Sequence, residues 1–416
     1  MSKFIIRGGN ALKGEVKICG SKNEVLPALC ACLLTAEPVI IRNVPRISDV
    51  DKLLKIIISL GAEAKWTGEH EVRVCARAVN LGHLDAALVA GFRGSVLLMG
   101  PLLARFGSVT LPEPGGDIIG KRPLDDHFNA FEEMGAKVVA AHDSVSISGS
   151  LHGSEDILPI FSVTATENVL MAAALTTGRT VIKLAAAEPH VQKLCQMLAA
   201  MGATVEGAGT HTIIVTGAKT LHGCDHTISG DMLEAGTFIV AVAATGGEAT
   251  LTGVDANDLD MVLNVVHSIG IKTSIVHGKL RVTAPAAIKP FRLQTLPYPG
   301  FATDLQAPFS VLATQANGMS MIHDPMYEGR LAHIPWLVKM GANAVVCDPH
   351  RVVISGPTPL HGYEIKALDI RSGATMVIAG LAARGETIVH DAEILDRGYE
   401  RLAERLASLG ADIRRE

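Results

Sequence analysis

Residues Ser48–Ala62, SDVDKLLKIIISLGA, end with a three-residue tag that the chain repeats, and this repeat indicates the fold. Each tag is a large apolar residue, a glycine and, in five of six cases, an alanine. In chain order the tags are Leu60–Ala62, Met134–Ala136, Met201–Ala203, Ile269–Ile271, Met340–Ala342 and Leu409–Ala411. They stand 67 to 74 residues apart, so the sequence predicts six copies of one supersecondary unit of about 70 residues.

The residues that lead to the first tag have the pattern of an amphipathic helix. Ser48 is placed to cap its start, and Gly61 is placed for the left-handed position just after its end. The apolar side chains follow helical spacing at Val50, Leu53, Leu54, Ile57 and Leu60. The tag therefore marks the end of a surface helix in every unit.

A second, apolar stretch precedes the surface helix in each unit. These stretches are rich in alanine, glycine and leucine, and they cover residues 26–35, 96–107, 169–178, 236–247, 309–318 and 376–385. A helix that is apolar on all sides is a buried helix. Each unit is therefore predicted to run hairpin, buried helix, strand, surface helix, strand.

Six such units exceed what one hydrophobic core can hold, because cores stop growing at about 250–300 residues. We therefore predict an α/β (α+β) protein of two domains with three units each. The first domain covers residues 21–230. The N-terminal stretch Phe4–Gly20 looks like a hairpin without a preceding unit, so residues 1–20 plus 231–416 form the second domain. The chain then crosses near residues 20 and 230, which predicts a hinge.

Composition excludes several classes of partner. The net charge is −5 and aromatic residues make up 4% of the chain, which argues against nucleic-acid binding. Proline, glycine or charge interrupts every apolar stretch, so we expect no membrane contact. The seven cysteines are scattered without a CxxC pair and the histidines form no ligand motif, so we expect reduced thiols, no metal and no cofactor. The start of the chain does not resemble a signal peptide, and we expect a cytoplasmic location.

Polar residues interrupt the repeat just before several buried helices. Lys22 and Asn23 precede the first, Arg93 the second, and Asp369 and Arg371 the sixth. A helix N-terminus with a nearby cation is a ready site for an anion. The alternative is that these residues are helix caps and solvated surface charges.

Two further stretches are rich in glycine, proline and charge. Residues 111–123, LPEPGGDIIGKRP, carry Asp117 and Arg122 and predict a lid loop over a site, or else an ordinary charged surface loop. The stretch PYPGFATDLQ places Asp304 in a similar setting, and Arg397 lies in ILDRGYERL. These residues complete the candidate site.

The motifs GSKN, PGGDxIGxRPLD, EAGTF, YPGFxTDxQ, YExR and LDRGYER together resemble the enolpyruvyl transferase family from end to end. The resemblance implies two inside-out α/β barrel domains of three repeats each. It also implies transfer of the enolpyruvyl group of phosphoenolpyruvate to the 3-hydroxyl of UDP-N-acetylglucosamine, with release of phosphate and without a cofactor. That reaction is the first committed step of peptidoglycan synthesis.

The resemblance also assigns roles to residues. It implies that Lys22, Arg122 and Arg397 hold the phosphoenolpyruvate and its developing charge, and that Arg330 and Arg371 lie on its carboxylate side. The residues expected to line the UDP-sugar site are Asn23, Arg93, Arg122, Pro123, Leu124, Asp125, Asp126, Ser162, Val163, Asp304 and Met326. Asp304 is the expected base at the 3-hydroxyl.

Asp117 stands where most members of the family carry a cysteine general acid. An ordinary aspartic acid has a pKa near 3.9, so proton donation near pH 7 requires a raised pKa, which we expect only when the lid closes over substrate. Without the thiol, the chain is expected to be insensitive to fosfomycin. The alternatives are an EPSP synthase, a paralogous transferase with another acceptor, and a non-enzymatic UDP-sugar-binding protein.

Overall fold

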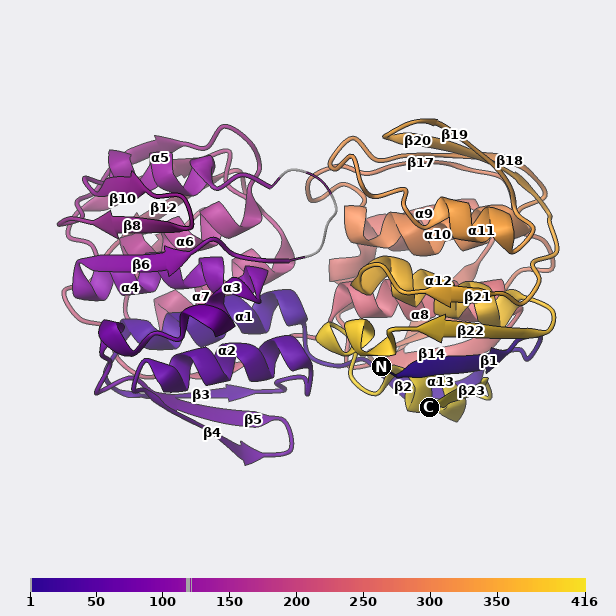
Figure 1. Cartoon of the computed structure of the whole chain (residues 1–416), viewed down its shortest axis with the longest axis horizontal. Coiled ribbons are helices and arrows are strands. Elements are labelled where there is room, and N and C mark those ends of the chain that lie inside the picture. The colour runs from indigo at the N-terminus through magenta and orange to yellow at the C-terminus, as the bar shows by residue number, and fades with distance from the viewer. Residues whose placement is uncertain (1, 117–119, 121) are drawn as a thin grey trace. The chain divides into compact units, whose positions relative to one another are not determined.

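The computed structural model describes residues 2–116, 120 and 122–416, and the chain divides into two compact units. Unit 1 contains residues 2–19 and 230–416, and unit 2 contains residues 20–116 and 122–229. Each unit has its own hydrophobic core. Figure 1 shows the elements of both units, coloured along the chain.

Unit 2 is built from three buried helices, four outer helices and three sheets. The buried helices are α1 (Lys22–Ala31), α4 (Met99–Phe106) and α6 (Val163–Ala174). The outer helices are α2 (Ser48–Ser59), α3 (Ala86–Ala90), α5 (Asp125–Glu133) and α7 (Pro189–Ala200), and the 3-10 turns are η1 (Cys32–Leu34), η2 (Leu81–His83) and η3 (Arg93–Leu98).

The described residues of unit 2 form three sheets. The first has the order β13 (Asp225–Thr227), β3 (Pro38–Arg42), β5 (Glu71–Cys75), β4 (Glu63–Gly68). The second has the order β6 (Ser108–Pro112), β8 (Ser144–Ser148), β7 (Lys137–Ala140). The third has the order β11 (Thr204–Glu206), β12 (Thr212–Thr216), β10 (Arg179–Lys183), β9 (Glu155–Ile157).

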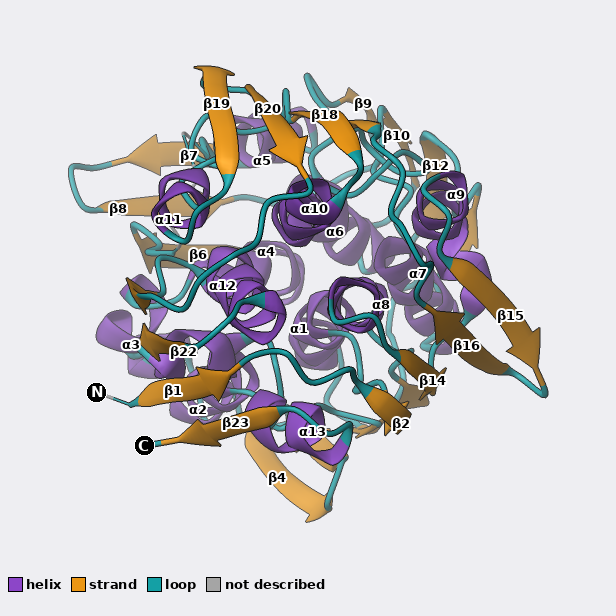
Figure 2. Cartoon of the chain, turned by 90° about the vertical axis from the view of Figure 1, so that its right-hand side faces the viewer, coloured by secondary structure: helices purple, strands orange, loops and turns teal. Residues whose placement is uncertain are grey.

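Unit 1 repeats this plan. Its buried helices α8 (Met232–Ala244), α10 (Thr303–Gln315) and α12 (Ile370–Ala382) contact one another and are seen nearly end-on in Figure 2, with the sheets around them. Its outer helices are α9 (Asp260–Ser268), α11 (Ile334–Lys339) and α13 (Leu402–Ser408), and its 3-10 turns are η4 (Ala256–Leu259) and η5 (Ala392–Arg397).

The three sheets of unit 1 have four strands each. The first runs β21 (Glu364–Lys366), β22 (Glu386–His390), β1 (Lys3–Arg7), β23 (Asp412–Arg415). The second runs β15 (Lys272–Val276), β16 (Lys279–Thr283), β14 (Glu248–Thr252), β2 (Lys13–Lys17). The third runs β17 (Arg292–Gln294), β18 (Gly318–His323), β20 (Arg351–Gly356), β19 (Asn343–Asp348). Six sheets around buried helices confirm the two-domain α/β prediction.

The six tags end their helices in the same way. Gly61 has a φ of 91°, and the amide of the next residue, Ala62, donates to the carbonyl of Ile57, which is the Schellman arrangement. The glycines of the other five tags also have positive φ. In every tag the glycine amide donates three residues back, as Gly61 does to Ile58, and the next amide donates five residues back. The prediction that Ser48 caps the helix is wrong, because Ser48 is already the first helical residue and follows Ile47.

The strands before α1 and α8 are exchanged between the units. In three repeats a strand, a buried helix and a parallel strand follow one another in one sheet, as β9, α6 and β10 do. By contrast, β2 precedes α1 but pairs with β14 in unit 1, and β13 precedes α8 but pairs with β3 in unit 2. The predicted N-terminal hairpin is therefore wrong: β1 lies between β22 and β23, and β2 joins another sheet.

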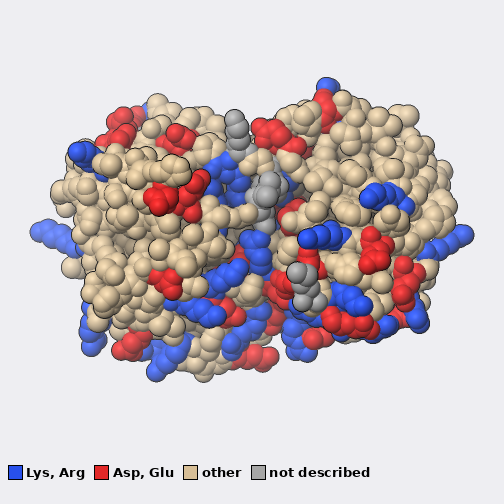
Figure 3. Space-filling model, in the orientation of Figure 1, with Lys and Arg blue, Asp and Glu red and all other residues tan. Residues whose placement is uncertain are grey.

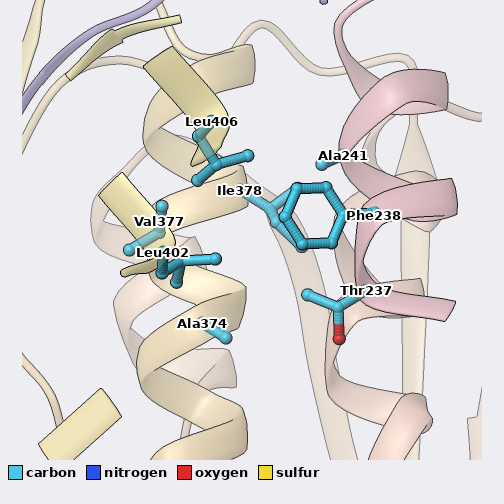
Figure 4. A pocket seen from close by; sticks show the side chains of 8 residues that line it. All are labelled: Thr237, Phe238, Ala241, Ala374, Val377, Ile378, Leu402 and Leu406. Atoms are coloured by element: carbon cyan, nitrogen blue, oxygen red, sulfur yellow. The ribbon is translucent and has the colours of Figure 1, made fainter. Parts of the chain in front are cut away.

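A small void lies inside unit 1 between α8, α12 and α13 (Figure 4). Its volume for water centres is about 10 Å³, which is at the lower limit for one water molecule. Its lining is Thr237, Phe238, Ala241, Ala374, Val377, Ile378, Leu402 and Leu406. Because this lining is almost wholly apolar, we assign the void to core packing and not to ligand binding.

The surface carries charges of both signs. On the face shown in Figure 3, acidic and basic side chains are interspersed over each unit with broad uncharged areas between them. Among the described residues, no helix is both long and apolar enough to cross a bilayer. The predictions of no nucleic acid, metal or cofactor stay predictions.

Candidate functional site

In unit 1, two predicted cations converge on one predicted carboxylate. Asp304 lies in the first turn of α10, Arg371 in the first turn of α12, and Arg330 in the connection between β18 and α11. Arg371 Nε donates to Asp304 Oδ2 at 2.9 Å, and Arg330 Nη2 donates to Asp304 Oδ1. Each carboxylate oxygen therefore has its own guanidinium partner.

Arg371 is held from a second side by Tyr399. Its Nη1 donates to the Tyr399 hydroxyl at 3.1 Å, and its Cζ lies 5.5 Å from the centroid of the Tyr399 ring. The same hydroxyl lies 3.0 Å from Thr237 Oγ1, which donates to the carbonyl of Leu233. Because a guanidinium only donates, Tyr399 accepts from Arg371 and gives its own proton to Thr237. This chain of bonds fixes the guanidinium plane.

The electrostatics of Asp304 follow from these contacts. Burial acts to raise its pKa, but the guanidinium groups of Arg330 and Arg371 outweigh burial and hold the pKa well below its ordinary value. Burial likewise acts to lower the pKa of Arg371, yet Tyr399 and Asp304 raise it overall. Asp304 is therefore a carboxylate between two permanent cations at neutral pH.

Asp324, a residue that the sequence analysis did not single out, organises the segments around this cluster. It is fully buried and accepts from Thr295 Oγ1 at 2.8 Å, from Thr303 Oγ1 at 2.6 Å and from the amide of Met326 at 3.0 Å. Thr303 immediately precedes Asp304, and Met326 is one of the predicted sugar-site residues. Asp324 therefore holds the segments of Thr303 and Met326 in fixed positions next to each other.

In unit 2, Lys22 is the first residue of α1, and Asn23 follows it. Lys22 Nζ lies 2.7 Å from Oδ2 of Asp49, a side chain that is 1% exposed. The ion pair with this buried carboxylate limits the rotamers of Lys22. The sequence pattern does not distinguish Asp49 from an ordinary acidic residue at a helix start. Its spacing from Leu53 and Ile56 places it on the buried face of α2.

Arg93 begins η3 and lies against Gly116 and Arg122 of the predicted lid. Its Nη2 donates to the carbonyl of Arg122 at 2.6 Å, and a Cβ on Gly116 would lie 2.8 Å from its own Cβ. The loop begins later than predicted, because Leu111 and Pro112 pair with β8 as the end of β6. Asp117 and Lys121 lie outside the described residues.

The remaining predicted sugar-site residues of unit 2 lie at two neighbouring helix starts. Pro123, Leu124, Asp125 and Asp126 lead into α5, and Ser162 caps α6, whose first residue is Val163. The two starts are joined because His127 Nε2 lies 3.1 Å from Thr164 Oγ1. Burial raises the pKa of Asp126 and lowers that of His127 to about 4, so His127 is neutral at pH 7.

Arg397 ends η5, which contacts β1 and α12, the helix that carries Arg371 in its first turn. The structure thus brings together Asp304, Arg330 and Arg371 in unit 1, and Arg93, Arg122 and the α5 and α6 starts in unit 2. Apart from its place between two arginines, nothing in the sequence pattern points to Tyr399. Among described residues, no group of three His, Cys, Asp or Glu side chains could hold a metal ion.

Each unit packs three buried helices inside three sheets, and Lys22 and Arg371 each lie in the first turn of a buried helix. The crystal structure of the enolpyruvyl transferase NikO from Streptomyces tendae is similar, with a TM-score of 0.90 and 26% identity, covering 100% of this chain and 98% of that one. EPSP synthase from Acinetobacter baumannii shares the fold, with a TM-score of 0.75 and 21% identity over 100% of both chains.

The sequence profile of EPSP synthase (3-phosphoshikimate 1-carboxyvinyltransferase) matches residues 6–406, and the chain belongs to this family. Similar proteins carry the name UDP-N-acetylglucosamine 1-carboxyvinyltransferase, among them the following two. The protein from Treponema denticola is 40% identical over 99% of both chains, and that from Magnetococcus marinus is 42% identical over 100% of this chain and 99% of its own. The predicted membership of the enolpyruvyl transferases is confirmed.

Proposed function

We propose that this protein transfers the enolpyruvyl group of phosphoenolpyruvate to the 3-hydroxyl of UDP-N-acetylglucosamine and releases phosphate. The observation that carries the proposal is full-length similarity to relatives with that named activity, at 40% and 42% identity. The reaction then supplies peptidoglycan synthesis in the cytoplasm.

The chemistry is addition followed by elimination. The 3-hydroxyl oxygen bonds to C2 of phosphoenolpyruvate, C3 takes a proton, and the hydroxyl proton passes to the Asp304 carboxylate. Phosphate then leaves C2 as C3 gives its proton back and the double bond reforms. Because both substrates are anions, fixed cations lower the free energy of the transition state more than mobile water does.

The arginine pair supports this assignment of the donor. Arg330 and Arg371 present guanidinium groups to both oxygens of one carboxylate, which is the geometry that a substrate carboxylate requires. Lys22, Arg122 and Arg397 are proposed for the phosphate. We place the UDP-sugar against Asn23, Arg93, the α5 start and Ser162.

The family name leaves shikimate 3-phosphate as a second acceptor to consider. The relatives described above favour the nucleotide sugar, and the GFRGSV stretch before α4 lacks the GNAGT-like run expected of the shikimate enzymes. The proposal is tested by incubating the protein with phosphoenolpyruvate and UDP-N-acetylglucosamine and locating the new ether by NMR. A product substituted at the 3-oxygen supports it, and unchanged UDP-N-acetylglucosamine refutes it.

We also propose Asp117 as the general acid in the position of the usual cysteine. A carboxyl group is not alkylated by fosfomycin as a thiol is, so the wild-type protein should keep its activity in the drug. The matched variant Asp117→Cys should become sensitive. Covalent labelling of the wild-type protein by fosfomycin would contradict this role.

A further inference from the structure

Two guanidinium groups of unit 1 already form a complete carboxylate site, and the protein's own Asp304 fills it. We propose that Asp304 is an internal placeholder for the carboxylate of the donor, which displaces it and frees it to act as base on the acceptor. This inference rests on the proposed function, because it takes phosphoenolpyruvate as the donor.

The geometry matches a carboxylate ligand on both oxygens. Arg371 Nε serves Oδ2 at 2.9 Å, and Arg330 Nη2 serves Oδ1. A pair of this kind holds a planar anion with fixed orientation. No other group is needed to seat a carboxylate at this position.

Asp304 is the outermost member of the cluster. Its side chain is 24% exposed, whereas those of Arg330 and Arg371 are 10% and 7% exposed. An anion that arrives from solvent therefore meets Asp304 above the two cations. Displacement needs only a rotation of one short side chain at the start of α10.

Each cation has a side-chain contact besides Asp304: Arg371 with Tyr399, and Arg330 with the ring of Tyr327, whose centroid lies 5.3 Å from its Cζ. Arg371 keeps its bond to Tyr399. The backbone carbonyl of Arg330 accepts from Gln306 Nε2 at 2.8 Å and lies 3.2 Å from His333 Nδ1. Within the described part of the chain, Nε of Arg330 is buried and makes no hydrogen bond, so a donor remains for an incoming anion.

The exchange couples donor binding to catalysis. Buried guanidinium groups are costly to leave without an anion, so Asp304 leaves only as another carboxylate arrives. Once released, Asp304 loses the two partners that hold its pKa well below its ordinary value and becomes a stronger base. The base is therefore activated only when the donor is present.

The test compares two unreactive phosphate esters in the wild-type protein and in Asp304→Asn. 2-Phospholactate keeps the carboxylate and phosphate of the donor, whereas isopropyl phosphate keeps the phosphate and lacks the carboxylate. Both are titrated by calorimetry with UDP-N-acetylglucosamine present. Asp324→Asn is the matched control, because it removes a nearby carboxylate that does not touch either guanidinium.

We expect Asp304→Asn to bind 2-phospholactate about tenfold or more tightly, since charged hydrogen bonds no longer compete with the ligand. Isopropyl phosphate should change by less than about twofold. Equal tightening of both esters would overturn the placeholder, since general electrostatics would then explain it. Unchanged or weaker binding of 2-phospholactate would overturn it as well.

A crystal structure of the wild-type protein with 2-phospholactate gives an answer that does not depend on a variant folding. The ligand carboxylate should lie within hydrogen-bond distance of both arginines, with Asp304 turned away. Asp304 still bonded to both arginines in that complex would refute the proposal. Turnover of UDP-N-acetylglucosamine is scored separately, so failure of the proposed function is not confused with failure of the placeholder.

Discussion

Replacing Tyr399 with phenylalanine removes one hydroxyl from the chain of bonds that fixes Arg371. The ring stays, so the packing of this 1% exposed side chain and its contact with the guanidinium are retained. What is lost is the 3.1 Å bond from Arg371 Nη1 and the 3.0 Å bond to Thr237. The variant therefore tests how far catalysis depends on the orientation of Arg371.

The expected magnitude follows from the charge on Arg371. A hydrogen bond to a charged group contributes about 1.5–3 kcal/mol, and the phenylalanine ring keeps the cation–π contact. We expect a loss of about 2 kcal/mol in transition-state binding, which is roughly 30-fold in kcat/KM for phosphoenolpyruvate. Most of the loss should fall on the donor because Arg371 is assigned to the donor carboxylate.

The assay is phosphate release at varied phosphoenolpyruvate and saturating UDP-N-acetylglucosamine. Thr237→Val is the matched control, because it leaves the bond between Arg371 and Tyr399 intact and removes only the acceptor beyond it. That variant should lose stability but less than about threefold in kcat/KM for the donor. Equal losses in both variants, or an unchanged kcat/KM in Tyr399→Phe, would refute the reasoning.

Three further predictions concern stability. Burial lowers the pKa of His333 in the folded protein to about 4, whereas the same side chain takes up its proton near pH 6.5 in the unfolded chain. The free energy of unfolding should therefore fall by up to about 3 kcal/mol as the pH falls from about 6.5 to about 4. Urea titrations of His333→Gln should show a weaker dependence on pH. Gly61→Ala should lower the free energy of unfolding by about 2–3 kcal/mol, since its Cβ would lie 2.5 Å from the carbonyl oxygen of Ala78. Gly246→Ala, where a Cβ would meet open space, should lower it by about 1 kcal/mol. Equal losses of the two variants on thermal unfolding would contradict the clash. Leu406→Ala enlarges the void of unit 1 and should lower the free energy of unfolding by about 3 kcal/mol. A loss below about 1 kcal/mol, measured from the denaturation midpoint, would show that the void collapses.

Much of each repeat could be predicted because its rules are local. A glycine in the left-handed position ends a helix through hydrogen bonds to residues a few positions back. The tag at Gly61 therefore predicts the end of a helix from the sequence alone. The apolar stretches predicted α1, α8 and α12 for the same reason, since a helix without a polar face has to be buried.

Long-range pairing could not be predicted from the same patterns. Lys3–Arg7 and Lys13–Lys17 look like a hairpin, yet β1 pairs with strands near the C-terminus and β2 with β14. An alternating strand pattern states which face is buried but not which strand lies beside it. The exchange of β2 and β13 between units is therefore visible only in the structure.

The candidate site divides in the same way. Cations such as Lys22 and Arg371 stand out because they interrupt apolar helix starts. Their partners Asp49 and Tyr399 are buried by neighbours distant in sequence, and neither residue type signals its contact. Sequence therefore identified the groups proposed to touch substrate but not the groups that position them.

The most direct test of the proposed function is phosphate release from phosphoenolpyruvate with UDP-N-acetylglucosamine as acceptor and shikimate 3-phosphate in parallel. We predict release with UDP-N-acetylglucosamine and none above background with shikimate 3-phosphate. Release only with shikimate 3-phosphate, or with neither acceptor from a folded protein, would contradict the proposed function.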